Sequence, residues 1–228
     1  MTVLPAADAL ARAIQGGFLA ALSRAVRKTE PYLYWLLDEV LPANAAEAIA
    51  ALPIAAPQGL VFSGRRETNN SSRTYFDESG RRNFPVVRAF AEAFQSAETV
   101  AAIQRTCGAS LDGTSLRVEY CQDTEGFWLE PHTDIGVKRF TMSLYLCRGE
   151  GAHDMGTDIY DANREWFGRA PSGFNCAMIF VPSKTTFHGF LARPMPAVRK
   201  SLIVNYVTQE WRNRHELAYP ETPVRGAA

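Results

Sequence analysis

The chain has 228 residues, and 24 lysines and arginines balance 24 aspartates and glutamates, so the formal net charge is zero. This balance argues against nucleic-acid binding or attachment to an anionic membrane, because the net charge attracts neither partner. Hydrophobic residues make up 46% and charged residues 21% of the chain, which is typical of a soluble globular protein with a sizeable core. We therefore predict one domain over residues 1–228.

The N-terminal part of the chain is predicted to be rich in helix. Apolar residues recur every four positions from Leu10 to Val26, which indicates an amphipathic helix. We expect this helix to cover the outside of a sheet, with a role in dimerisation as the alternative. Further along, the pattern predicts a strand over residues 32–37, a short helix over 42–52 and a strand over 60–63.

Residues 64–83 are polar and predict a mobile loop. Two interpretations stay open. The loop closes over a substrate, with arginines between Arg65 and Arg73 meeting an acidic group, or it is a surface loop without such a role. Residues 84–107 predict one or two helices that end at Gly108, because glycine is favoured just after a helix.

Strands are predicted to dominate from Ser115 onward. In residues 138–147, Thr141, Ser143 and Tyr145 share one face, and apolar residues share the other. Such a division indicates a barrel with a wet pocket on one side and packing on the other. The role of residues 149–166 is not evident from the sequence. The predicted strands are 115–121, 127–129, 138–147, 157–160, 176–181 and 199–207.

Three side chains offer a set of metal ligands. His132 and Asp134 are separated by one residue, so in an extended segment they point to the same side. A second imidazole is available from His188, which is predicted to lie in the loop after the apolar run 177–181. Two imidazoles and a carboxylate that leave coordination positions open suit non-haem iron(II) that activates oxygen.

The other histidines are weaker candidates. His153 directly precedes Asp154, so the two side chains would diverge on a strand, and His215 lies in a polar tail. An H-x-D triplet alone is also compatible with a hydrogen-bonded histidine at position 132 that binds no metal. The presence of His188 and of a basic residue after it favours the metal site.

A cation follows His188 at the start of the last predicted strand. Alternation places Arg199 and Ser201 on one face and Lys200 on the other. A guanidinium holds a carboxylate through two parallel hydrogen bonds, and a serine hydroxyl can add a third. The alternative is an exposed arginine in a salt bridge. Its position after His188 favours a role in binding an acid.

Together these residues resemble the motif of the iron(II)/2-oxoglutarate-dependent dioxygenases, in the bacterial prolyl-hydroxylase-like branch. The resemblance extends in character from about residue 32 to about residue 207, and is clearest in 32–42, 115–120 and 126–132. The motif consists of His132 and Asp134, the distal His188, and Arg199 with Ser201.

The resemblance implies a mainly β fold with flanking helices: a double-stranded β-helix, or jelly roll, over about residues 111–210, supported by a helix-rich region over about 1–110. It also implies that His132, Asp134 and His188 hold Fe(II), and that Arg199 and Ser201 bind the far carboxylate of 2-oxoglutarate. Dioxygen would be the oxidant, with ascorbate as a reductant. Related halogenases lack the carboxylate ligand, so Asp134 favours hydroxylation or another C–H oxidation.

The substrate stays open. A small metabolite, a saccharide or natural-product intermediate, and a peptidyl side chain as in prolyl hydroxylases are all compatible. Arg117, Trp128, Trp166 and the 65–73 arginines are candidate contacts, each with a purely structural alternative. Two interpretations come from other classes: a cupin-like metal isomerase or hydrolase, and a non-catalytic binding barrel. The sequence does not indicate whether the chain forms a homo-oligomer.

The cysteines and the N-terminus predict a cytoplasmic protein. No two cysteines form a C-x-x-C pair, which favours buried free thiols in a reducing compartment. Asp8 and Arg12 interrupt the first apolar stretch, so no signal peptide is predicted. No segment has the roughly 18 consecutive apolar residues of a membrane span. The four cysteines are Cys107, Cys121, Cys147 and Cys176.

Overall fold

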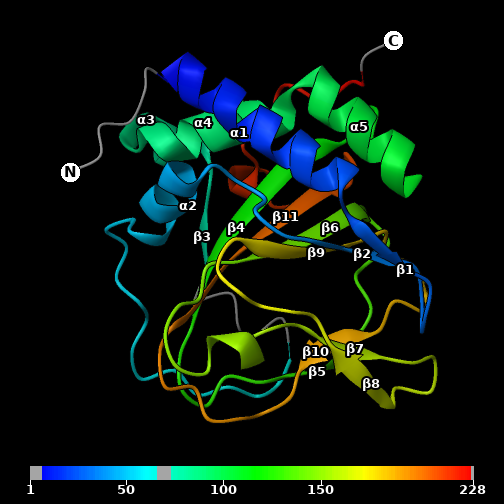
Figure 1. Cartoon of the computed structure of the whole chain (residues 1–228). Helices are drawn as coiled ribbons and strands as arrows, with labels where there is room; N and C mark the ends of the chain where they lie inside the picture. Colours follow the sequence, from blue (N-terminus) through cyan, green and yellow to red (C-terminus); the bar gives the residue numbers. More distant parts are fainter. Residues whose placement is uncertain (1–6, 66–72, 227–228) are drawn as a thin grey trace.

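The computed structural model describes residues 7–65 and 73–226. Helices gather on one side, a large sheet lies in the middle, and a small sheet lies on the far side (Figure 1). Neighbouring strands in both sheets are antiparallel. Two facing antiparallel sheets with helices packed on the outside form a jelly roll, so the predicted fold class is confirmed.

The helices pack on one another and on the large sheet. The apolar stripe of the first helix is buried against α4 and α5, as a covering helix requires. Gly108 ends the last helix with φ 71°, in the left-handed conformation that glycine adopts without strain. In the described part of the chain, no helix is both long and apolar enough to cross a membrane. The helices are α1 (Ala7–Ser23), α2 (Ala43–Ala50), α3 (Glu78–Asn83), α4 (Pro85–Gln95) and α5 (Ala97–Cys107).

The large sheet has the order β1-β2-β9-β6-β11-β4-β3, and the small sheet has the order β5-β10-β7-β8. The strands of the large sheet are β1 (Val26–Lys28), β2 (Tyr34–Leu37), β3 (Arg73–Tyr75), β4 (Ser115–Asp123), β6 (Lys138–Tyr145), β9 (Cys176–Phe180) and β11 (Arg199–Val207). Those of the small sheet are β5 (Leu129–His132), β7 (Asp158–Tyr160), β8 (Trp166–Arg169) and β10 (His188–Phe190).

Several local predictions were wrong. Val26 does not continue the first helix but lies exposed in β1. Residues 60–63 form no strand, and the strand predicted over 127–129 starts only at Leu129. His188 begins the strand β10 and does not lie in a loop. The predicted loop 64–83 contains β3 and α3, while its residues 66–72 lie outside the described part. No residue of α3 is buried, so no apolar period marked this helix in the sequence.

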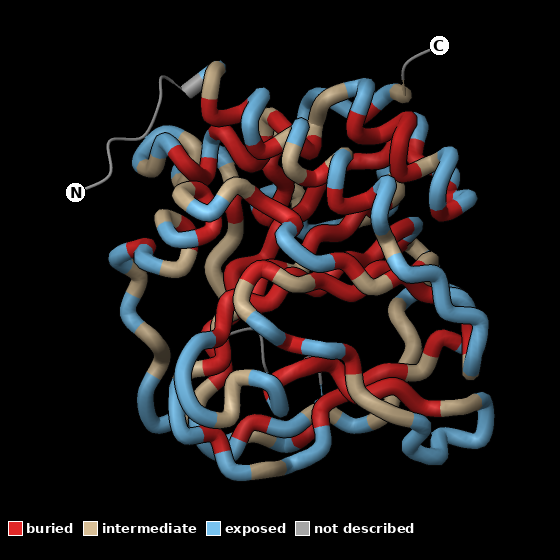
Figure 2. Tube along the Cα trace, in the orientation of Figure 1, coloured by how far each residue is buried: buried red, intermediate tan, exposed pale blue. Residues whose placement is uncertain are grey.

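The two faces of the large sheet differ in chemistry. The outer face packs against the helices and forms the main core, which is visible as the continuous buried zone in the upper half of Figure 2. The inner face looks toward the small sheet. It is polar and charged along β3, β4 and β11, and apolar along β2 and β9, where Tyr34, Met178 and Phe180 belong to a second buried cluster. Along β11, Leu202 and Val204 belong to the core, whereas Arg199 and Ile203 line an inner cavity. This division follows the predicted alternation.

Replacing Phe90 with alanine is expected to lower the free energy of unfolding by about 3–5 kcal/mol, because it opens a cavity between α4 and the sheet. Phe90 is fully buried and stacks on Phe94 with ring centroids 4.4 Å apart. Urea denaturation measures the loss. Phe167→Ala is the control, since that side chain is 48% exposed; a similar loss there would contradict the assignment of the core.

Candidate metal centre

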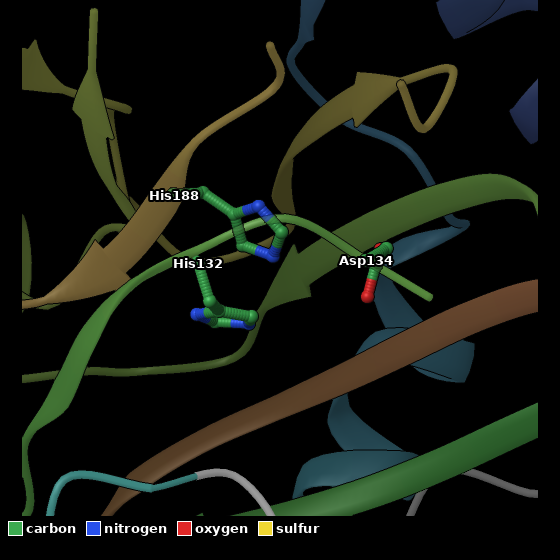
Figure 3. Close-up of side chains that lie close together, drawn as sticks. All are labelled: His132, Asp134 and His188. Carbon is green, nitrogen blue, oxygen red and sulfur yellow. The ribbon is translucent and has the colours of Figure 1, made fainter. Parts of the chain in front are cut away.

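His132, Asp134 and His188 come together at the edge of the small sheet. His132 ends β5 and lies opposite His188, which begins β10. Asp134 follows two residues after the end of β5. One ligand atom from each side chain lies within 4.8 Å of the other two. Figure 3 shows the two imidazole rings side by side, with the Asp134 carboxylate next to them.

Backbone carbonyl groups orient both imidazoles. Nδ1 of His132 lies 2.9 Å from the oxygen of Glu130, and Nδ1 of His188 lies 3.0 Å from the oxygen of Thr186. A carbonyl oxygen only accepts, so Nδ1 carries the proton in each ring and donates it. The Nε2 atoms are then the basic nitrogens, which is the form that binds a metal.

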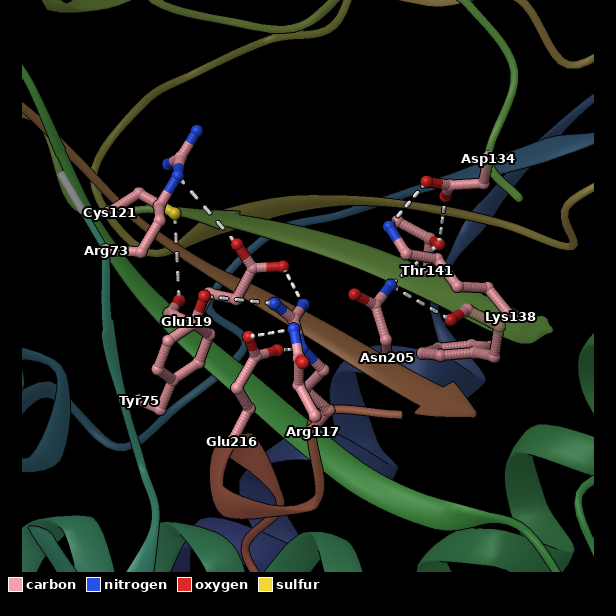
Figure 4. Close-up of polar contacts among 12 residues, drawn as sticks. Arg73, Tyr75, Arg117, Glu119, Cys121, Asp134, Lys138, Thr141, Asn205 and Glu216 are labelled. Atoms are coloured by element: carbon pink, nitrogen blue, oxygen red, sulfur yellow. Dashed lines mark hydrogen bonds and ion pairs between the residues drawn. The ribbon is translucent and has the colours of Figure 1, made fainter. Parts of the chain in front are cut away.

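Two side chains hold the Asp134 carboxylate. Lys138 Nζ lies 2.5 Å from Oδ1, and the Thr141 hydroxyl donates to Oδ2 over 2.6 Å. Asn205 in turn donates to the Thr141 hydroxyl over 2.9 Å (Figure 4). The Asp134 and Lys138 side chains are both 2% exposed. The carboxylate is therefore fixed in orientation before any metal binds.

A β-bulge turns Lys138 toward this carboxylate. Phe140 lies opposite Tyr206 on the outer face, but the next pair along the strands joins Lys138 to Val207. The shift in register places Lys138 on the inner face, whereas strict alternation groups it with Phe140. Bulges redirect single side chains in this way. The sequence carried no sign of the bulge, and the role of Lys138 was missed.

The predicted cation lies inside the molecule. Arg199 is 7% exposed and lines a cavity of about 40 Å³ together with Asp134 and His188. Its Nε donates to the oxygen of Met155 over 2.7 Å, and its Nη1 donates to Asp123 over 2.5 Å. The ion pair with Asp123 was not foreseen, although the two residues lie opposite each other on β11 and β4.

Ser201 and Lys200 lie on opposite faces of the sheet. Ser201 pairs with Tyr145, and its buried hydroxyl has no hydrogen-bond partner in the described part of the protein. Lys200 instead reaches outward to α2, where its Nζ donates to the oxygen of Ala50 over 2.7 Å. Of these three neighbours, Arg199 and Ser201 lie on the inner face, which looks toward the small sheet, and Lys200 lies on the outer face.

A second, larger cleft of about 240 Å³ reaches two of the ligands, His132 and Asp134, from outside. His132, Asp134 and Lys138 line it, together with Trp211 and Arg117. The Arg117 guanidinium lies 4.5 Å from the Trp211 ring centroid and 4.9 Å from that of Tyr75. It also pairs with Glu119 and Glu216, which ties the segment after β11 to β4 (Figure 4). Trp211 was not singled out in the sequence.

The remaining candidates lie elsewhere. Trp128 and Trp166 line neither cavity; their indole N–H groups donate to Phe62 and Asp158 respectively. His153 and His215 are exposed, as expected. Of the 65–73 arginines, Arg65 is exposed, Arg73 lines the inner cavity, and the others fall within residues 66–72, outside the described part.

Asp158 supports the strand that carries His188. It lies opposite Gly189, accepts from the Leu191 N–H over 2.7 Å, and pairs with Arg193 at 2.6 Å. Burial alone would raise its pKa, but the hydrogen bonds from Arg193 and Leu191 outweigh burial and lower the pKa below the ordinary value. The carboxylate thus stays ionised and anchors β10.

Comparison with solved structures shows the same fold in prolyl hydroxylases. A Pseudomonas putida prolyl-4-hydroxylase aligns with a TM-score of 0.54 and 15% identity, over 86% of this chain and 98% of its own. A Phytophthora capsici prolyl 4-hydroxylase aligns with a TM-score of 0.55 and 16% identity, over 91% of this chain and 67% of its own.

A Trichoplax adhaerens prolyl hydroxylase, in complex with a peptide fragment of the hypoxia inducible factor oxygen degradation domain, aligns with a TM-score of 0.55 and 12% identity, over 89% and 92% of the two chains. No family model and no curated protein matches the sequence. The chain therefore has the fold of the prolyl hydroxylases, as the sequence motif suggested, and this similarity is one of fold.

Replacing His188 with alanine is expected to weaken binding of a divalent metal roughly 100-fold or more, because one of the nitrogen donors is lost. Calorimetric titration with Mn²⁺ measures the change. His153→Ala is the control, since its side chain is 82% exposed and lies outside the cluster. Equal affinity in the two variants would rule out His188 as a ligand.

Replacing Lys138 with methionine is expected to increase the stabilisation that a bound divalent metal provides. The Lys138 ammonium and the metal compete for the Asp134 carboxylate, and the metal-free variant leaves that carboxylate without its buried counter-charge. Thermal unfolding with and without Mn²⁺ should show a lower melting temperature without metal and a larger shift with it. Lys184→Met, at an exposed position, should match the unmodified protein.

Proposed function

We propose that the chain is an iron(II)- and 2-oxoglutarate-dependent dioxygenase that hydroxylates an organic substrate. One observation carries the proposal: the two imidazoles and the carboxylate come together, and two of these side chains, Asp134 and His188, line a cavity whose wall also holds the buried Arg199. Two neutral imidazoles and one carboxylate fit Fe(II) with open positions. A buried cation beside the buried Ser201 hydroxyl fits the far carboxylate of the cosubstrate.

The ion pair of Arg199 with Asp123 is compatible with this role. A guanidinium has five N–H donors, and Asp123 and the Met155 oxygen each accept one of them. Donors remain for a second carboxylate, and Asp123 keeps the guanidinium in place. Arg199 therefore acts as an anchored clamp rather than as a flexible surface cation.

Bound iron and 2-oxoglutarate would supply the oxidising chemistry, in which dioxygen, oxidative decarboxylation to succinate and substrate hydroxylation are coupled. In the protein, His132 and His188 present Nε2, because carbonyl groups hold their Nδ1 protons. Thr141 and Lys138 keep the Asp134 carboxylate turned toward the site. Ascorbate is proposed as the reductant that maintains ferrous iron.

We propose a small organic molecule as the substrate, bound in the larger cleft beside the metal ligands. The cleft combines the apolar side chains of Leu129 and Ile135 with the polar groups of Asn213 and Glu130. A peptidyl side chain is the second candidate, because the Trichoplax adhaerens protein of the same fold is in complex with a peptide. Succinate formation against pooled metabolites and pooled peptides distinguishes the two.

Other classes of function fit the site less well. A cupin-like isomerase or hydrolase does not require a buried arginine in the cavity beside the ligands. A non-catalytic binding barrel does not require the cluster of metal ligands. A cytoplasmic location is also proposed, because all four cysteines are free thiols. The zero net charge supports a small-molecule partner over nucleic acid.

Anaerobic titration tests the proposal directly. Addition of 2-oxoglutarate to the protein with Fe(II) should produce a weak visible charge-transfer band from the chelated metal. The same addition to a His132→Ala variant should produce none. A protein that develops no band with any 2-oxo acid would instead support an isomerase, a hydrolase or a binding barrel.

Arg199→Gln is expected to weaken 2-oxoglutarate binding roughly 30-fold or more, since truncating one partner of a buried charge pair is costly. Lys200→Gln should change it less than about threefold, because Lys200 points to α2 on the other face. The dissociation constants come from the anaerobic titration. Similar losses in both variants would mean that the effect arises from general destabilisation of β11.

A further inference from the structure

A second buried arginine lines the inner cavity. Arg73 begins β3 at the edge of the large sheet, opposite Cys121 of β4, and Cys121 lies opposite Ser201 of β11. The three residues thus form one row across the inner face. The Arg73 side chain is 4% exposed, and it lines the same cavity as Arg199 and His188.

Arg73 and Arg199 share one carboxylate. Asp123 Oδ2 accepts from Arg199 Nη1 over 2.5 Å, while Asp123 Oδ1 lies 3.4 Å from Arg73 Nη1. The other ion pair of Arg73, from Nε to Glu119 Oε2, is 3.8 Å long (Figure 4). Apart from this long ion pair with Asp123, the buried Arg73 Nη1 makes no hydrogen bond in the described part of the chain. A buried donor of this kind is costly unless a ligand satisfies it.

The local charge favours an added anion once a metal is bound. Three cations, Arg73, Arg117 and Arg199, balance three carboxylates, Asp123, Glu119 and Glu216. Cys121 adds no charge, because burial raises the pKa of its thiol to about 11 and keeps it neutral. A divalent metal at the neighbouring ligands would make the cavity positive, and a dianionic oxo acid would restore the balance.

We propose that Arg73 is a second contact for the far carboxylate of 2-oxoglutarate, with Asp123 setting the spacing between it and Arg199. The proposal rests on the proposed function and deepens it. Two guanidinium groups from different strands, β3 and β11, hold one carboxylate more selectively than a single cation does. The cavity is then specific for a dicarboxylic 2-oxo acid.

A purely structural arginine would behave differently. If Arg73 serves only to neutralise Glu119 and Asp123, its loss distorts the cavity for every 2-oxo acid alike. If it contacts the far carboxylate, its loss affects only acids that carry one. 2-Oxobutyrate has the chelating 1-carboxylate and 2-oxo group of 2-oxoglutarate but no far carboxylate, so it separates the two cases.

Calorimetric titration of the full chain loaded with Mn²⁺, without oxygen, provides the test. For Arg73→Gln, the dissociation constant of 2-oxoglutarate should rise roughly tenfold or more, the range of a charge-assisted hydrogen bond, while that of 2-oxobutyrate stays unchanged. Arg73→Lys keeps the positive charge but loses the two parallel N–H donors of the guanidinium. The dissociation constant of 2-oxoglutarate should therefore rise less than in Arg73→Gln, again with that of 2-oxobutyrate unchanged. If Arg73→Gln does not fold, Arg73→Lys provides the test.

Arg193→Gln is the matched control. Arg193 is also largely buried and paired with a carboxylate, Asp158, at 2.6 Å, but it does not line the cavity. It should leave the preference for 2-oxoglutarate over 2-oxobutyrate unchanged. If the Arg73 variants weaken the binding of both acids equally, or weaken neither, the proposed role of Arg73 is wrong, although the proposed function still stands. Failure of the unmodified protein to bind 2-oxoglutarate would overturn the proposed function with it.

Discussion

The pairing of β5 with β10 is the interaction on which the site depends. Directly paired residues on antiparallel strands have Cα atoms roughly 5 Å apart, so this pairing sets the imidazoles of His132 and His188 beside each other. Both strands are short and contribute little stability themselves. Asp158 adds stability to this sheet, because its carboxylate accepts a hydrogen bond from the backbone after β10 and forms ion pairs with Arg169 and Arg193. The ligand cluster therefore rests on a small sheet that is held by these ion pairs and by two small apolar clusters, which include Ile159 and Phe190.

The inner face of the large sheet carries a closed set of buried charges. Four cations and four carboxylates lie in or beside the two cavities, and buried charges persist only when they are paired. The cations are Arg73, Arg117, Lys138 and Arg199, and the carboxylates are Glu119, Asp123, Asp134 and Glu216. A divalent metal and a dianionic oxo acid bound together leave this balance unchanged, whereas either one alone disturbs it. The proposed function thus agrees with the electrostatics of the whole face.

Much of this face was predictable from alternation along single strands. The division of β11 into Arg199 and Ser201 on one side and Lys200 on the other required only the two-residue period of a strand. Lys138 shows the limit of that rule, because a bulge inverts its face and depends on the register with β11. The helix α3 and the strand β3 were missed for a related reason: they have few apolar residues, and tertiary contacts decide their conformation.

By itself, the sequence determined the types of donor and the division of β6 and β11 into a wet and a packed face, since these follow from residue chemistry and local period. The strand β10, which carries His188, was not predicted, because its three residues are too few to show a period. Only the tertiary structure decided which distant groups meet. Strand register brings Arg73 and Arg199 to the same carboxylate, that of Asp123, and turns Lys138 toward Asp134. The reversal of the chain after β11 brings Glu216 to Arg117. Strand register depends on the hydrophobic patterns of both paired strands and on the turns that join them, so the pattern of one strand alone does not give it.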